Sequence, residues 1–132
     1  MNKINIALVG ATGSGKTTII SLLSRFYDPT NGEILVDGKN IKYVDLYSYR
    51  SQMGIMLQDT FLFSSTIMEN IRYGRLDATD EEVINAAKAA QCEEIFDKMP
   101  DGINTVVGSS GVYLSGGEAQ RIALARAILK DA

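Results

Sequence analysis

The first half of the chain places short apolar runs between polar, glycine-containing turns. Residues 4–9 are mostly apolar and end at Gly10, which predicts a buried strand followed by a loop. After Lys16 the apolar residues recur at i, i+3, i+4 and i+7, and this spacing predicts a helix with one apolar face. The residues on that face are Ile19, Leu22, Leu23 and Phe26. Because proline disfavours helical geometry in the residue before it, Asp28-Pro29 is expected to stop this helix.

The next stretch predicts a hairpin, a short helix and another strand. Residues 33–36 are strand-like and lead into Asp37-Gly38, a dipeptide that favours a tight turn. Residues 45–52 are compatible with a short helix. Residues 53–57 form a second apolar run and predict another buried strand.

The second half is predicted to be mostly helical. Residues 66–72 and 93–98 each predict a short helix. Between them, Thr79 and Glu82 have the spacing of a capping box, in which each side chain bonds the other residue's backbone N–H at a helix start. The apolar face of that helix comprises Val83, Ala86, Ala87 and Ala90. The order of elements predicts an α/β core with an attached helical region.

Composition narrows the possible functions. A chain of 132 residues fits one domain, and its 45% hydrophobic and 22% charged residues are typical of a folded globular protein. Its 13 basic and 16 acidic residues leave a formal net charge of −3, which argues against a general nucleic-acid binder. The chain has no histidine and a single cysteine, Cys92. Histidine-based catalysis, a cysteine zinc cluster and an internal disulfide are therefore excluded within it.

The strongest local signal is residues 10–17, GATGSGKT, which match the pattern G-x-x-x-x-G-K-[ST] between a predicted strand and a predicted helix. Glycines let the backbone curl so that successive N–H groups point at phosphate oxygens, and the helix start adds a positive dipole end. Lys16 is expected to reach the β- and γ-phosphates of a nucleotide, and the Thr17 hydroxyl to bind Mg²⁺. The expected nucleotide-binding residues are Gly10, Thr12, Gly13, Ser14, Gly15, Lys16, Thr17 and Thr18. The alternative, a flexible turn with a chance lysine, is disfavoured by the flanking elements.

A pair of glycines opens the last predicted helix, in the stretch Leu114-Ser115-Gly116-Gly117-Glu118. Ser115 and Glu118 have the spacing of a second capping box, and a helix cap alone is one interpretation. The apolar face of the helix comprises Ile122, Ala125, Ile128 and Leu129. Glycine is a poor helix former, so two glycines in the first turn indicate that another molecule approaches the backbone closely at this point. Bare amides and a serine hydroxyl at a helix N-terminus suit an anion.

The order of these motifs resembles the ATP-binding domain of an ABC transporter. The Walker A loop of that family is matched by residues 10–17, its Q-loop by Gln58, and its signature by residues 114–118, with glutamate where glutamine is more usual. Residues 57–64, with Glu69-Asn70-Ile71 after them, are similar to exporters that carry fused transmembrane domains. The resemblance covers essentially the whole chain.

The resemblance implies an α/β fold: a P-loop NTPase core of ABC type with an attached helical subdomain, incomplete at both ends. The expected division is a core over residues 1–60, a mostly helical subdomain over residues 61–115 and the signature helix over residues 116–132. It also implies ATP and Mg²⁺ as ligands. Thr17 and Gln58 are the expected metal ligands, and Gln58 also positions the attacking water. Without the resemblance, Gln58 would be interpreted as a solvated loop residue.

The resemblance further implies two protein partners. A second ABC domain would pair head to tail with this one, and its ATP would face the signature residues, Ser115, Gly116, Gly117 and Glu118. The other partner is a transmembrane domain, and no nucleic-acid partner is expected. The sequence contains no run of the roughly 20 apolar residues that a membrane span requires. The domain is therefore expected at the cytoplasmic face of the cell membrane, where transmembrane domains outside this chain would hold it.

The expected activity is ATP hydrolysis that drives export of a substrate across a membrane. The family's Walker B strand, catalytic glutamate and switch histidine follow the signature helix, and the chain ends before their expected place. We therefore expect the intact protein to be an ATPase and this chain alone to be nearly inactive. Two alternatives stay open: a non-transport ABC ATPase, and a non-catalytic nucleotide-binding product.

Overall fold

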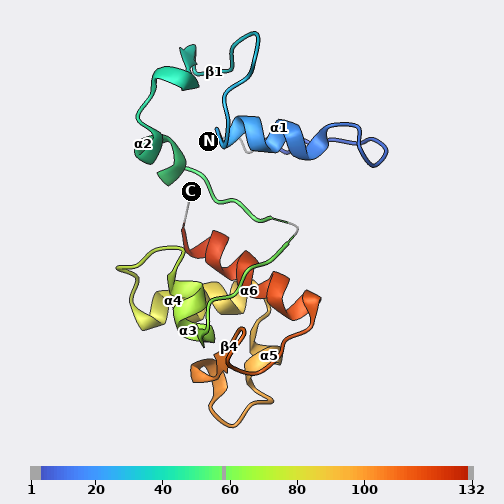
Figure 1. Ribbon diagram of the computed structural model, residues 1–132. Helices are drawn as coiled ribbons and strands as arrows, with labels where there is room; N and C mark the ends of the chain where they lie inside the picture. The colour runs from blue at the N-terminus through green and yellow to red at the C-terminus, as the bar shows by residue number, and fades with distance from the viewer. Residues whose placement is uncertain (1–3, 58, 131–132) are drawn as a thin grey trace. The chain divides into compact units, whose positions relative to one another are not determined.

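The computed structural model describes residues 4–57 and 59–130, which divide after Gln52 into two compact units. The first unit holds α1 (Lys16–Leu23), a two-stranded sheet, the 3-10 turn η1 (Ile41–Tyr43) and α2 (Leu46–Ser51). The second unit holds another two-stranded sheet, four helices and the 3-10 turn η2 (Gly102–Asn104) (Figure 1).

Helix α1 ends before the predicted stop at Asp28-Pro29. Its last turn closes in a Schellman motif, in which the N–H of Phe26 bonds the carbonyl of Ser21 and the N–H of Arg25 bonds that of Leu22, at 2.9 and 3.0 Å. Arg25 has a left-handed backbone, with φ of 51°, at the position where glycine is usual. A local C-cap therefore ends the helix, and the prediction that proline ends it is wrong.

The predicted turn at Asp37-Gly38 joins β1 (Leu35–Val36) to β2 (Lys39–Asn40) in an antiparallel hairpin. The register places Val36 opposite Lys39. Both turn residues have left-handed backbones, with φ of 49° and 75°, as a type I′ turn requires. The turn prediction is confirmed, and the strand before it is shorter than predicted.

Helix α2 confirms the short helix predicted in this region, and its side chains bind the end of α1. The hydroxyl of Tyr49 donates to the carbonyl of Leu23 at 2.7 Å. The guanidinium of Arg50 donates to the carbonyls of Ser24 and Arg25, at 3.1 and 2.6 Å. These bonds satisfy carbonyls that a helix C-terminus leaves without intrahelical partners.

Two predicted strands do not form in the described part of the chain. Residues 4–9 have no regular structure, and Val9 is 95% exposed. Residues 53–57 are also irregular, and Met56 and Leu57 are exposed. A strand requires a neighbouring strand whose backbone groups bond to its own, and none pairs with either run within residues 4–57 and 59–130. Both strand predictions are therefore wrong.

The core of the second unit lies between three helices that pack side by side: α3 (Ile67–Arg72), α4 (Asp80–Ala89) and α6 (Gly116–Leu129) (Figure 1). Side chains with no exposed surface include Ile67, Ile71, Val83, Ala87, Cys92, Val107, Ile122 and Ala125. The helix predicted at residues 66–72 is confirmed, with Thr66 as its N-cap.

Helix α4 begins with the predicted capping box. The Glu82 carboxylate accepts the N–H of Thr79 at 2.8 Å, and the Thr79 hydroxyl accepts the N–H of Glu82 at 3.3 Å. Its predicted apolar face is buried. Helix α5 (Glu93–Phe96) follows and is shorter than predicted.

The second sheet pairs β3 (Ser65–Thr66) with β4 (Val106–Val107) in antiparallel register, with Ser65 opposite Val107. The loop after β4 packs closely against neighbouring backbone. A Cβ on Gly108 would lie 2.8 Å from the carbonyl oxygen of Phe63, so only glycine fits there without a shift.

Helix α6 buries Ile122, Ala125 and Leu129, as predicted, but Ile128 is 39% exposed. The predicted apolar face was therefore too wide, because the packing of α3 and α4 covers only a narrow stripe of α6. Among the helices in the described residues, none has the length and hydropathy needed to cross a membrane.

Candidate nucleotide-binding site

The glycine-rich loop has a backbone shape that glycine permits. Gly13 and Gly15 are left-handed, with φ of 81° and 91°, and the N–H of Ser14 bonds the carbonyl of Ala11 at 3.1 Å to close a turn. Gly15 is also the N-cap of α1, so no side chain caps the first turn of this helix. The N–H groups of that turn are therefore accessible to an anionic ligand.

Lys16 folds over the loop. Its Nζ donates to the carbonyls of Gly10 and Ala11, both at 2.7 Å, and to Oγ of Ser14 at 3.3 Å. In residues 4–57 and 59–130, no carboxylate forms an ion pair with this ammonium. Its charge is thus held at the loop by neutral acceptors, and anionic phosphate oxygens would bond the same ammonium more strongly.

Four hydroxyl-bearing residues lie in the loop and in the first turn of α1, and all four are exposed: Thr12, Ser14, Thr17 and Thr18. Mg²⁺ prefers one or two protein oxygens together with waters and nucleotide phosphates, rather than a cage made by protein alone. The described residues contain no cluster of three acidic, cysteine or histidine side chains that could hold a metal by itself. The Thr17 hydroxyl lies in the first turn of α1, and its role as a ligand of Mg²⁺ stays a prediction.

The signature residues form the capping box predicted at the start of α6. The Glu118 carboxylate accepts the N–H and the hydroxyl of Ser115, at 2.8 and 2.9 Å, and the Ser115 Oγ accepts the N–H of Glu118 at 3.3 Å. The backbone N–H of Ser115, and then its hydroxyl, hold the pKa of Glu118 below its usual range. The charges of Lys98 and Arg121 lower that pKa further.

The two signature glycines are not required by the structure around them. A Cβ on Gly116 or Gly117 would meet no atom within 4 Å, and neither residue has a left-handed backbone. Gly74 is the opposite case, because a Cβ there would lie 2.1 Å from the carbonyl oxygen of Arg126. The fold therefore explains Gly74 and leaves Gly116 and Gly117 as exposed, bare backbone.

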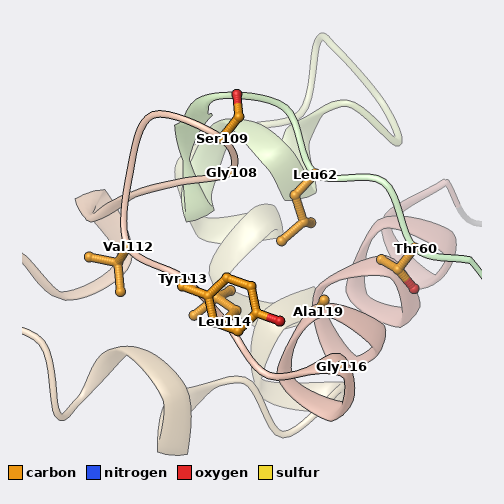
Figure 2. A pocket seen from close by; sticks show the side chains of 9 residues that line it. All are labelled: Thr60, Leu62, Gly108, Ser109, Val112, Tyr113, Leu114, Gly116 and Ala119. Carbon is orange, nitrogen blue, oxygen red and sulfur yellow. The ribbon is translucent and has the colours of Figure 1, made fainter.

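A groove of about 380 Å³ lies beside the signature residues (Figure 2). It is bounded by residues 60–62, the loop at residues 108–114 and the start of α6. Two of the residues that line it are Tyr113, which is 91% exposed, and Thr60, whose buried hydroxyl has no hydrogen-bond partner among the described residues. The remaining lining residues are Leu62, Gly108, Ser109, Val112, Leu114, Gly116 and Ala119.

Gln58 lies outside the described residues, so its contacts with Mg²⁺ and the attacking water stay a prediction. Its described neighbours, Leu57 and Asp59, are exposed. The phosphate-binding loop belongs to the first unit, and the signature residues belong to the second.

Sequence reasoning missed a polar network that follows Gln58 in the chain. Asn70 is fully buried, and its Oδ1 accepts the N–H of Phe63 at 2.9 Å and a guanidinium N–H of Arg126 at 3.1 Å. Burial lowers the pKa of Arg126. The triplet Glu69-Asn70-Ile71 was part of the resemblance. No local pattern indicated that Asn70 would bond to Arg126, which lies 56 residues later on α6.

A glycine-rich loop that leads through a lysine into a helix is typical of proteins that bind nucleotide phosphates. The exposed start of α6 is a second helix N-terminus that suits an anion. The family model described as ABC transporter matches residues 2–132. The chain therefore belongs to the ABC transporter family, as its motifs predicted.

Several transporters are similar to the chain over nearly its whole length. The mitochondrial iron-sulfur clusters transporter ATM1 of Saccharomyces cerevisiae is 51% identical over 126 residues, which cover 96% of this chain and 18% of that protein. The putative multidrug export ATP-binding/permease protein YgaD of Bacillus subtilis is 54% identical, over 96% of this chain and 22% of that protein. The ATP-dependent lipid A-core flippase of Legionella pneumophila is also 54% identical, over 97% and 22%. The chain thus spans about a fifth of the length of these relatives.

A solved structure supports the same assignment. A bacterial Atm1-family ABC exporter with ATP bound matches with a TM-score of 0.86 and 48% identity, over 91% of this chain and 21% of that chain. The chain therefore has the fold of part of an ABC transporter's nucleotide-binding domain. Its helices and small sheets are consistent with a partial α/β fragment.

Proposed function

We propose that this chain binds ATP with Mg²⁺ at residues 10–18 and contributes to the ATPase site of a membrane exporter. The observation that supports this most is the start of α1. Gly15 caps the helix without a side chain, and the Nζ of Lys16 is held against the loop at 2.7 Å from two carbonyls. Both features suit a polyphosphate, which accepts backbone N–H bonds and takes up a lysine ammonium.

Each loop residue has a proposed role. Lys16 exchanges its carbonyl acceptors for the β- and γ-phosphates, and the Thr17 hydroxyl binds Mg²⁺. Bound Mg²⁺ neutralises charge on the phosphate oxygens during phosphoryl transfer. Gln58 positions the attacking water and approaches the same ion. The glycines at 10, 13 and 15 and the hydroxyl residues Thr12, Ser14 and Thr18 complete the contacts with the nucleotide.

The signature residues serve the ATP of a second ABC domain, paired head to tail. The open space around Gly116 and Gly117 supports this role, because it allows another molecule to approach the backbone. The Ser115 hydroxyl and the first-turn N–H groups of α6 are the proposed donors to that phosphate. Glu118 holds Ser115 in place through the capping box.

In the intact protein, ATP hydrolysis drives export through transmembrane domains, with this segment at the cytoplasmic face of the membrane. The exporters among its relatives support this assignment. We expect the 132-residue chain alone to bind ATP but to hydrolyse it very slowly. Among the described residues, no carboxylate forms a hydrogen bond with Lys16 of the phosphate-binding loop. The division into residues 1–60, 61–115 and 116–132 remains part of this proposal.

A nucleotide titration tests the central claim. The wild-type chain, K16A and K42A are titrated with a fluorescent ATP analogue in the presence of Mg²⁺. Lys42 is an exposed lysine of the same unit, so K42A makes the same change in charge away from the loop. We expect K16A to bind at least about tenfold more weakly than wild type, since it loses charge-assisted bonds to phosphate, and K42A to bind within about twofold. Equal binding by K16A and wild type would overturn the proposal.

A further inference from the structure

The loop that carries Gln58 is anchored at both ends on a single turn of α6. Before the loop, Gly54 packs against α6 so closely that a Cβ on it would lie 3.1 Å from the carbonyl oxygen of Ala127. After the loop, the carbonyl of Phe61 accepts an N–H of Arg126 at 3.2 Å. Two consecutive residues of α6 therefore contact the chain on either side of Gln58.

Asn70 extends this anchor. The Nε–H of Arg126 donates to the carbonyl of Asn70 at 2.8 Å, and a second guanidinium N–H reaches its side-chain oxygen at 3.1 Å. The side-chain amide of Asn70 donates to the carbonyls of Phe63 and Thr66, at 2.9 and 3.0 Å. Side-chain bonds from Arg126 and Asn70 thus hold Phe61, Phe63 and Thr66, and Asn70 has no exposed surface.

Arg126 contributes to these contacts more through the planar shape of its guanidinium than through its charge. Within residues 4–57 and 59–130, no carboxylate pairs with Arg126, and its guanidinium lies 5.7 and 5.9 Å from the ring centres of Phe63 and Tyr73. Its planar fork reaches two separate segments, at Phe61 and at Asn70. A lysine would keep the charge but could not bond both in this geometry.

We infer that Arg126 is a positioning residue, which with Asn70 fixes the Gln58 loop to α6. This helix has 14 residues, so it is about 21 Å long, and Ser115 caps its other end. A packed helix moves as a rigid element, so a displacement of the Gln58 loop is transmitted to the signature serine. The inference rests on the proposed function for the roles of Gln58 and Ser115.

Kinetics of the full-length protein that contains this segment separate positioning from folding. R126K keeps the positive charge but removes the planar guanidinium that bonds Phe61 and Asn70 at the same time. R121K is the matched control on the same helix, where Arg121 bonds the carbonyl of Gln91 and the carboxylate of Glu94. We expect R126K to lower kcat for ATP hydrolysis at least about fivefold with the Kd for ATP within about twofold, and R121K to change neither. A wild-type kcat for R126K, or equal losses of kcat and ATP binding, would overturn the inference.

Hydrogen exchange of the 132-residue chain tests the anchor without any nucleotide. We expect amides of residues 53–66 to exchange at least about threefold faster in R126K than in wild type, and at the wild-type rate in R121K. N70D gives an independent test, because aspartate keeps the shape and the acceptor bonds but cannot donate to Phe63 and Thr66. Unchanged exchange in both R126K and N70D would overturn the inference. Failure of the wild-type chain to bind ATP would instead overturn the proposed function and leave the anchor standing.

Discussion

The hydroxyl of Ser115 and the carboxylate of Glu118 are hydrogen-bonded to each other at 2.9 Å across the first turn of α6. The same carboxylate oxygen accepts the backbone N–H of Ser115 at 2.8 Å. A negative charge therefore already lies at this helix N-terminus, where it is stabilised by the helix dipole. The Ser115 hydroxyl has one proton to donate, so a phosphate that accepts a hydrogen bond from it must replace Glu118 as the acceptor. The residue at position 118 therefore influences anion binding.

The first prediction concerns pH. Hydrogen bonds from Ser115 hold the pKa of Glu118 below its usual range. A carboxylate with a lowered folded-state pKa contributes stability above its unfolded pKa, which is about 4.3, and loses it as the pH falls through the folded value. We therefore expect the free energy of unfolding to fall as the pH drops below about 4.3, and to fall less steeply in E118Q.

Urea unfolding of wild type and E118Q across acid and neutral pH measures this difference. The Glu82 carboxylate in the α4 capping box has its pKa lowered in the same way, first by the backbone N–H of Thr79. E82Q should therefore flatten the pH dependence as well, and the double variant should flatten it further. Superimposable pH profiles for wild type and E118Q would contradict the prediction.

Elements that depend on nearby residues could be predicted from the sequence. Both capping boxes require residues three apart, and both form. The turn at Asp37-Gly38 requires two residues that tolerate left-handed backbones, and it also forms. In these cases the residues that determine the structure lie within one turn of each other, so a local pattern contains the necessary information.

Elements that depend on distant partners could not be predicted. The apolar runs at residues 4–9 and 53–57 have strand composition, but no strand in the described residues pairs with them. The bonds from Arg126 to Asn70 and Phe61 join positions more than 50 residues apart. Nothing in the local sequence of either partner indicates the other, because the contact exists only once α3 and α6 have packed.

The second prediction contrasts two glycines. A Cβ on Gly74 would lie 2.1 Å from the carbonyl oxygen of Arg126, and a backbone atom cannot rotate away. We expect G74A to destabilise the chain by about 3 kcal/mol or more, or to prevent folding. G116A is the matched control, because its Cβ would meet nothing within 4 Å, and alanine favours helix by up to about 1 kcal/mol over glycine.

Thermal or urea unfolding of the two variants provides the comparison. G116A should be at least as stable as wild type, while G74A should unfold at a clearly lower denaturant concentration. Equal stabilities for G74A and wild type would mean that residue 74 does not pack against the backbone of α6.

The third prediction separates folding from function at Gly117. The fold leaves the space around this residue empty, so G117A should fold with at least wild-type stability. If the glycine instead allows a second ABC domain and its ATP to approach, the added methyl blocks that approach. We expect G117A to lower the ATPase rate of the full-length protein at least about tenfold, since about 1.4 kcal/mol of lost transition-state binding has that effect. Wild-type turnover by G117A would contradict the proposed role of the signature.

The fourth prediction concerns Gln91, which follows the C-cap of α4 and has a left-handed backbone with φ of 57°. The cap around it is a Schellman motif, in which the N–H of Cys92 bonds the carbonyl of Ala87 at 2.9 Å. The left-handed conformation costs a residue with a side chain about 1 kcal/mol relative to glycine. The side chain of Gln91 is exposed, and Arg121 bonds only its backbone carbonyl.

Replacing Gln91 with glycine should therefore remove the strain and keep every bond of the cap. We expect Q91G to raise the free energy of unfolding by about 1 kcal/mol, measured by urea denaturation of the 132-residue chain. A89G, two residues earlier in the helical part of α4, should have the opposite effect and cost about 1 kcal/mol. A loss of stability in both variants would show that the glycine preference of this cap is outweighed by the flexibility that glycine adds to the unfolded chain.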